Sequence, residues 1–71
     1  MKFVTFRVYA SGYRVAVNPE AVSLVGEMPD RIPQIGDKDV TYHAVIHRID
    51  GGSLEVTSTY EQVVKALEEK K

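Results

Sequence analysis

Residues 40–49, VTYHAVIHRI, decide the fold because they form the strongest predicted strand in the chain. Apolar residues occupy both faces of this stretch, with Val45 and Ile49 on one face and Ala44 and Ile46 on the other. A strand that is apolar on both faces is usually central in a sheet or covered on both sides. The rest of the sheet is therefore expected to pair around residues 40–49.

A partner strand follows this segment directly. Asp50-Gly51-Gly52 predicts a tight turn, because glycine adopts positive φ without steric cost. Residues 53–57, SLEVT, then form a short strand with Leu54 and Val56 pointing inward.

A β-hairpin is predicted at the N-terminal end of the chain. Residues 2–9, KFVTFRVY, and residues 13–17, YRVAV, both alternate with period two. The turn between them, Ala10-Ser11-Gly12, is short and contains glycine, as hairpin turns commonly do.

A third strand is predicted for residues 21–28, AVSLVGEM, with Val22, Leu24 and Met28 on one parity. Asn18-Pro19-Glu20 ends the preceding strand, since proline cannot donate to a ladder. The alternative for this segment is a short helix, which Asn-Pro-Glu would also open. Residues 29–39, PDRIPQIGDKD, are rich in proline, glycine and aspartate and predict a long loop.

The chain ends in a predicted helix over residues 59–70. An apolar stripe with helical spacing and a capping box formed by Ser58 and Glu61 support it. Lys70 and Lys71 lie at the negative end of its dipole. The stripe consists of Tyr60, Val63, Val64 and Leu67. The fold class is therefore α+β: one domain over residues 1–71, with a small antiparallel sheet of about five strands and one C-terminal helix packed on it.

The composition narrows the functional classes. The 71 residues include no cysteine, which excludes disulfides, thiolate nucleophiles and cysteine-based zinc sites. Nine basic and ten acidic residues give a net charge of −1, so the charge does not favour nucleic acid or an anionic membrane as partner. No apolar run approaches the roughly 18 residues of a membrane span. We expect a soluble, cytoplasmic protein.

Two segments resemble the FlbD-type flagellar and swarming motility proteins. Residues 13–25, YRVAVNPEAVSLV, are similar to the opening of that family, a strand, Asn-Pro and a valine-rich strand. Residues 49–64, IDGGSLEVTSTYEQVV, are similar to its ending, a strand, Asp/Asn-Gly, a strand and Ser-x-x-Glu-Val. Comparable small proteins also occur in phages and mobile elements. The resemblance implies a non-enzymatic accessory or regulatory role and supplies no catalytic residues; residues 29–39 look like an insertion relative to it.

No motif for catalysis or for a cofactor stands out. His43 and His47 lie on one face of a predicted strand, with Cα atoms about 13 Å apart, too far for both to bind one zinc ion at about 2 Å. A metal site between chains or a pH-sensitive surface are the alternatives for this pair. Asp30 and Asp37-Lys38-Asp39 are too few for a calcium loop. We predict no enzyme, no metal and no cofactor.

Aromatic and basic residues define a candidate binding surface. If Val4, Phe6, Val8, Val15, Val17 and Leu24 pack on the helix, the opposite face carries aromatics and arginines, a composition typical of interfaces. The candidate binding residues are Phe3, Arg7, Tyr9, Arg14, Arg31, Tyr42, His43 and His47.

Three functions are compatible with this surface. The leading hypothesis is an interaction or regulatory module, a homo-oligomer that binds an unknown protein partner. The first alternative is an oligomer that binds a nucleotide or another anionic metabolite through arginine and histidine. The second is a module that stacks single-stranded nucleic acid on its aromatic rings, which the near-neutral charge makes the less favoured partner.

Overall fold

The computed structural model describes residues 3–36 and 38–69. In this part of the chain the elements are β1 (Val4–Arg7), β2 (Arg14–Val17), the 3-10 turn η1 (Pro19–Ala21), β3 (Val22–Pro29), β4 (Tyr42–Arg48), β5 (Ser53–Glu55) and α1 (Tyr60–Glu69). The predicted α+β class and the single C-terminal helix are confirmed. Lys70 and Lys71, expected at the negative end of the helix dipole, lie outside the described residues.

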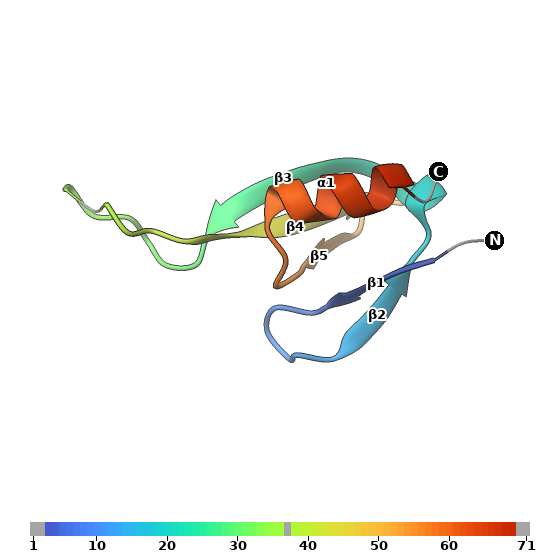
Figure 1. The fold of residues 1–71 in the computed structure, drawn as a ribbon, viewed down its shortest axis with the longest axis horizontal. Helices are drawn as coiled ribbons and strands as arrows, with labels where there is room; N and C mark the ends of the chain where they lie inside the picture. The colour runs from blue at the N-terminus through green and yellow to red at the C-terminus, as the bar shows by residue number, and fades with distance from the viewer. Residues whose placement is uncertain (1–2, 37, 70–71) are drawn as a thin grey trace.

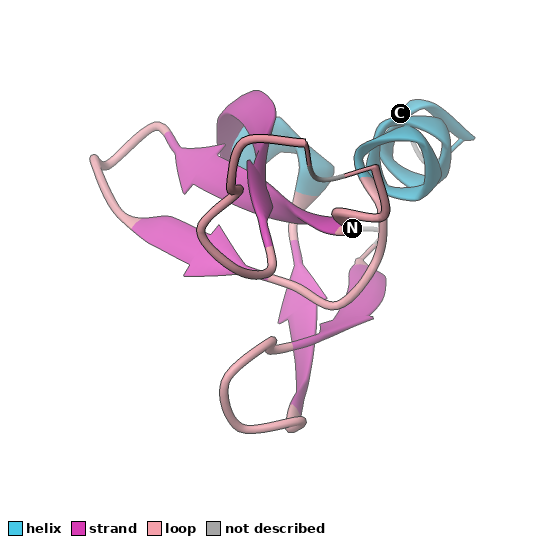
Figure 2. Ribbon diagram, turned by 90° about the vertical axis from the view of Figure 1, so that its left-hand side faces the viewer, coloured by secondary structure: helices cyan, strands magenta, loops and turns pink. Residues whose placement is uncertain are grey.

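The strands form two antiparallel sheets, where a single sheet was predicted. β4 is the central strand of the order β3-β4-β5, in agreement with its apolar residues on both faces, and β1 pairs with β2 alone. One isolated bridge, between Val8 and Val56, links the two sheets. The Tyr9 N–H donates to Glu55 O at 2.9 Å, and the Thr57 N–H donates to Arg7 O at 3.0 Å. Because the pairing is limited to this bridge, the β1–β2 hairpin forms a separate sheet below the other three strands (Figures 1 and 2).

The core lies between α1, one face of the three-stranded sheet and the hairpin. α1 runs across β3 and β4 (Figure 1), and its buried residues are Val63 and Leu67. Ala44 and Ile46 face it from β4 and are fully buried. The buried apolar set is Val4, Phe6, Val17, Ala44, Ile46, Val56, Val63 and Leu67. No helix in the described part of the chain is long and apolar enough to span a membrane.

β3 departs from the predicted parity. A register shift against β4 falls between Val22 and Leu24, so that Val22 and Val25 pack against the core. Leu24, predicted to face the helix, is instead 56% exposed, and Met28 is 41% exposed. A bulge changes which face each later side chain occupies, and this explains the failure of simple alternation.

Both interpretations of residues 18–28 hold in part. Asn18 accepts the Glu20 N–H at 3.0 Å and caps the short turn η1, and Pro19 occupies its first position. Proline suits that position because the first N–H groups of a helical turn have no internal partner. β3 begins immediately afterwards, so the helical segment amounts to one turn.

The cap of α1 lies one residue later than predicted. Thr59 Oγ1 accepts the Gln62 N–H at 3.3 Å, and Gln62 Oε1 accepts the Thr59 N–H at 3.0 Å. This reciprocal pair is a capping box formed by Thr59 and Gln62, and not by Ser58 and Glu61.

We therefore expect Thr59→Ala to lower the free energy of unfolding by about 1 kcal/mol, because the Gln62 N–H at the helix start loses its hydrogen-bond acceptor, Thr59 Oγ1. Ser58→Ala is the matched control and should change stability by less than about 0.5 kcal/mol. Urea denaturation followed by circular dichroism measures both. An equal loss for the two variants would contradict the assignment of the cap to Thr59.

The long loop forms an arm, defined here as residues 30–36 and 38–41. It continues the β3–β4 ribbon away from the helix (Figure 1) and accounts for the elongated outline of 45 × 23 × 20 Å. The Asp30 N–H donates to Thr41 O at 2.9 Å and closes the base of the arm. The predicted loop over residues 29–39 thus coincides with most of the arm.

Candidate functional site

A buried histidine holds the base of the arm. His43, on β4, is only 3% exposed. Its Nδ1 lies 2.6 Å from Asp30 Oδ1 and its Nε2 lies 2.8 Å from Glu55 Oε1. Thr41 Oγ1 donates to the other oxygen of Asp30, and the Tyr9 ring stacks on His43 with centroids 3.8 Å apart and planes 5° apart. We call Tyr9, Asp30, Thr41, His43 and Glu55 the His43 cluster.

The geometry of the cluster favours the positively charged form of His43. An ionised carboxylate only accepts hydrogen bonds, so a ring placed between two of them must donate from both nitrogens, which makes it an imidazolium. Burial opposes this charge, but hydrogen bonds to Glu55 and Asp30 outweigh burial and raise the pKa of His43 above 6.5. The hydrogen bond from Thr41, followed by that from His43, lowers the pKa of Asp30. Desolvation, followed by the charge of Asp30, raises the pKa of the Tyr9 hydroxyl.

This geometry suits a structural clamp better than a catalytic base. A general base needs a ring nitrogen within reach of a substrate proton, and both nitrogens of His43 are already engaged. The cluster instead ties both ends of the arm to β4, to β5 and to Tyr9 beyond the end of β1. The cluster therefore fixes the position of the arm relative to the sheet.

Of the eight predicted binding residues, the structure stacks Tyr9 on His43 and pairs Arg7 with Arg14 across the hairpin. Phe3, Arg7 and Arg14 are exposed on the hairpin, and Arg31 is exposed on the arm. Tyr42 is exposed at the start of β4, and His47 is half-buried four residues after His43. These residues were expected to share one surface of one sheet. The strands instead form two sheets, and the predicted residues are divided between them and the arm.

Two arginines face each other on the hairpin. Arg7 and Arg14 are directly paired across β1 and β2, and both are exposed. Like charges in such a pair repel each other. Arg7 Nη1 donates to Gly12 O at 2.9 Å, which directs its guanidinium toward the hairpin turn.

Among the described residues, no group of three or more His, Cys, Asp or Glu side chains is placed to hold a metal ion. Both ring nitrogens of His43 are occupied by its carboxylate partners, while His47 lines the outer groove, which it shares with Glu55. Asp37, considered for a hard cation, lies outside the described residues.

The arm presents apolar side chains to solvent. Ile32 is 87% exposed and Ile35 is fully exposed. Pro33 lies between them, and Gly36 follows with φ of 88°, a left-handed conformation that glycine adopts readily. Exposed apolar groups that gather on one projecting segment mark interaction surfaces more often than isolated ones do.

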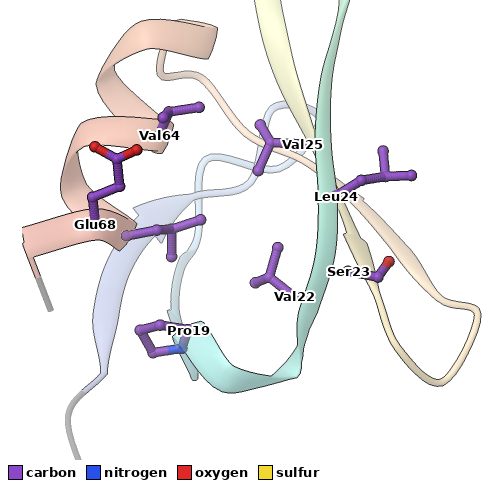
Figure 3. Close-up of a pocket in the computed structure, with 8 residues that line it drawn as sticks. Pro19, Val22, Ser23, Leu24, Val25, Val64 and Glu68 are labelled. Atoms are coloured by element: carbon purple, nitrogen blue, oxygen red, sulfur yellow. The ribbon is translucent and has the colours of Figure 1, made fainter. Parts of the chain in front are cut away.

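β3 forms an outer edge of the three-stranded sheet and has a groove on each face. The helix-side groove, about 190 Å³, lies between Pro19, Val22, Val25, Val64, Leu67 and Glu68. Figure 3 shows Val22 and Val25 pointing toward α1 and Leu24 pointing away from it. The outer groove, about 420 Å³, is lined by Gly26, Met28, Val45 and His47, among others. An edge strand with grooves for alternate side chains is the arrangement used in recognition by strand addition.

Sequence reasoning did not identify Asp30 and Glu55 as partners of His43, nor the exposed isoleucines. One signal was available for Glu55, since the turn at Asp50-Gly51-Gly52 sets the register in which Val45 faces Glu55. Glu55 then lies diagonal to His43 on the same face. Asp30 had no comparable signal, because its approach to His43 depends on how β3 pairs with β4 across the arm.

The chain matches no protein-family model, and comparison with curated proteins and with solved structures gives no significant match.

Proposed function

We propose that this chain is a small non-enzymatic protein-binding module with a regulatory role, which acts in the cytoplasm as a homo-oligomer. The observation that carries the proposal is the arm, which projects from the sheet and exposes Ile32 and Ile35 while its base is clamped by the His43 cluster. A monomer gains no stability from isoleucines in water, whereas a partner that covers them would gain their full burial. The clamp reduces the conformational freedom that binding would otherwise remove.

The resemblance to FlbD-type motility proteins supports the same function. It was carried by residues 13–25 and 49–64, and it implies an accessory or regulatory protein without catalytic residues. The arm lies between these two segments, where that family has no counterpart. Under this proposal the arm provides the contact specific to this chain.

The two alternative functions receive less support. An anion site would need several basic groups around one point. Arg7 and Arg14 are paired on the hairpin, but Arg48 Nη2 lies 3.2 Å from Asp50 Oδ2 and His43 is paired with two carboxylates. Base stacking would need several free aromatic faces on one surface. One face of Tyr9 is covered by His43, and the exposed rings of Phe3, Tyr13 and Tyr42 are divided between the hairpin and β4.

The test is recovery of partner proteins with the double variant Ile32→Ser/Ile35→Ser. The tagged chain would be expressed in its natural host, cross-linked and purified, and its partners identified by mass spectrometry. We expect the wild type to retain a specific protein and the double variant to lose it by roughly a hundredfold, since each buried isoleucine contributes about 1.5–3 kcal/mol.

Tyr13→Ser is the matched control, because Tyr13 is also highly exposed but lies by the hairpin turn. It should retain the partner, and all three proteins should unfold at the same temperature. Equal recovery with the double variant would exclude the arm as the contact. A wild type that retains nothing would contradict the proposed function.

A further inference from the structure

We propose that β3 pairs with β3 of a second copy of this chain, antiparallel about a two-fold axis at Gly26. The two three-stranded sheets would then form one continuous sheet, with both helices on the same face. This inference rests on the proposed function, because it gives the homo-oligomer a defined interface. It starts from β3 as the outer strand of its sheet, an edge that invites pairing with another chain.

The backbone groups on this edge have the parity that such pairing requires. The Asp30–Thr41 hydrogen bond continues the β3–β4 ladder past Pro29. In an antiparallel strand each residue directs its N–H and its C=O to the same side, and successive residues alternate between the two sides. Gly26 and Met28 therefore direct theirs to β4, while Val25 and Glu27 direct theirs to the open side. Pro29, which has no N–H, occupies an open-side position, where edge strands tolerate proline.

An axis at Gly26 pairs these open groups with each other. Val25 then lies opposite Glu27 of the second copy, and these two residues exchange two backbone hydrogen bonds. The two-fold axis repeats this pair between Glu27 and Val25 of the second copy, which gives four hydrogen bonds in total. An axis at Glu27 would set two carboxylates against each other, which destabilises a pair. An axis at Val25 would set Glu27 opposite Ser23, within the register shift at Val22/Leu24.

The side chains on the outer face are self-complementary in this register. Leu24 and Met28, both substantially exposed, lie opposite each other across the axis. Gly26 lies between them, in a pair where Cα atoms approach to about 4.5 Å. A Cβ at Gly26 would meet nothing within 4 Å, and its φ lies outside the left-handed region. Gly26 therefore leaves open space on this face between Leu24 and Met28.

Cysteine cross-linking tests the register directly, because the natural chain has no cysteine. Gly26→Cys should form a covalent dimer under mild oxidation, since position 26 faces itself across the axis. Leu24→Cys should not, since position 24 faces position 28, whereas Leu24→Cys/Met28→Cys should. No covalent dimer with Gly26→Cys, or equal cross-linking with Leu24→Cys, would overturn the proposal.

A comparison of Glu27→Pro with Glu27→Gln distinguishes the contribution of backbone strand pairing from that of the Glu27 side chain. Both remove the carboxylate, but only proline removes the open-side N–H, at a position where β4 pairing does not need it. We expect Glu27→Gln to dimerise like the wild type and Glu27→Pro to raise the dimer dissociation constant roughly thirtyfold, because two hydrogen bonds are lost. Analytical ultracentrifugation measures both. Equal dissociation constants for the two variants would overturn the pairing.

Amide exchange in the wild type gives a measurement that does not depend on the folding of Glu27→Pro. Protection of the Val25 and Glu27 amides that grows with protein concentration supports the dimer, and fast exchange at all concentrations overturns it. A monomeric wild type that still retains a partner through Ile32 and Ile35 would end this inference and leave the proposed function intact.

Discussion

Ile46→Ala is expected to lower the free energy of unfolding by about 2–5 kcal/mol. Ile46 is fully buried on the central strand and belongs to the core formed with α1 and the hairpin. Truncation removes its apolar contacts and leaves a cavity that rigid β4 neighbours cannot close. A domain of this size typically has only a few kcal/mol of stability, so the variant should be largely unfolded at 37 °C.

Ile49→Ala is the control for this prediction. It is the same substitution three residues along the chain, but Ile49 is 70% exposed in the turn after β4. Its effect should stay below about 0.5 kcal/mol. Thermal and urea denaturation, followed by circular dichroism, measure both variants. Similar losses at the two positions would mean that the core is not centred on β4.

His43→Gln is expected to lower stability by about 2–3 kcal/mol near pH 5.5 and by much less at alkaline pH. The variant loses two charge-assisted hydrogen bonds, to Asp30 and to Glu55, and the stacking partner of Tyr9. The arm should lose its fixed base at the same time. Faster amide exchange at Thr41 and increased proteolysis within residues 30–41 would report that loss.

The pH dependence follows from the directions of the pKa shifts. The folded pKa of His43 is raised, so its stabilisation is complete below 6.5, the value for unfolded chain, and disappears as the pH rises through the folded value. The folded pKa of Asp30 is lowered, so its contribution is present above 3.8 and is lost as the pH falls through the folded value. The difference between wild type and His43→Gln should therefore be largest between pH 3.8 and 6.5.

Melting temperatures measured from pH 4 to pH 9 test this profile. His47→Gln is the control, since His47 lies on the same face but lines the open outer groove. It should follow the wild-type curve. A difference between wild type and His43→Gln that grows with rising pH would mean that His43 is buried as the neutral ring, and it would contradict the imidazolium assignment.

The local pattern of apolar residues and glycines in the sequence identified most secondary-structure elements of this protein. Period-two alternation found all five strands, although β1 is shorter than the predicted residues 2–9, and glycine placed the two hairpin turns. The apolar stripe found α1 to within a residue or two. These features depend on neighbours in sequence, whose side chains fix backbone preference wherever the strand lies in the fold. Thr59 was missed as the cap because two overlapping pairs, Ser58 with Glu61 and Thr59 with Gln62, satisfy the same spacing rule.

The candidate site was much less accessible from the sequence. Leu24 is exposed because of a register shift between Val22 and Leu24, and no residue type in 21–28 predicts that shift. The His43 cluster gathers side chains from positions 9, 30, 41, 43 and 55, and the first of these comes from the turn of the β1–β2 hairpin.

The sequence by itself determined the α+β class, the central strand and the C-terminal helix, because turn chemistry and hydrophobic period act over a few residues. Only the tertiary structure decided that the strands form two sheets, that Ile46 is buried while Ile49 is exposed, and that His43 lies between two carboxylates. Those outcomes depend on strand register and on contacts between distant segments, where a shift of one residue moves a side chain to the other face of the sheet.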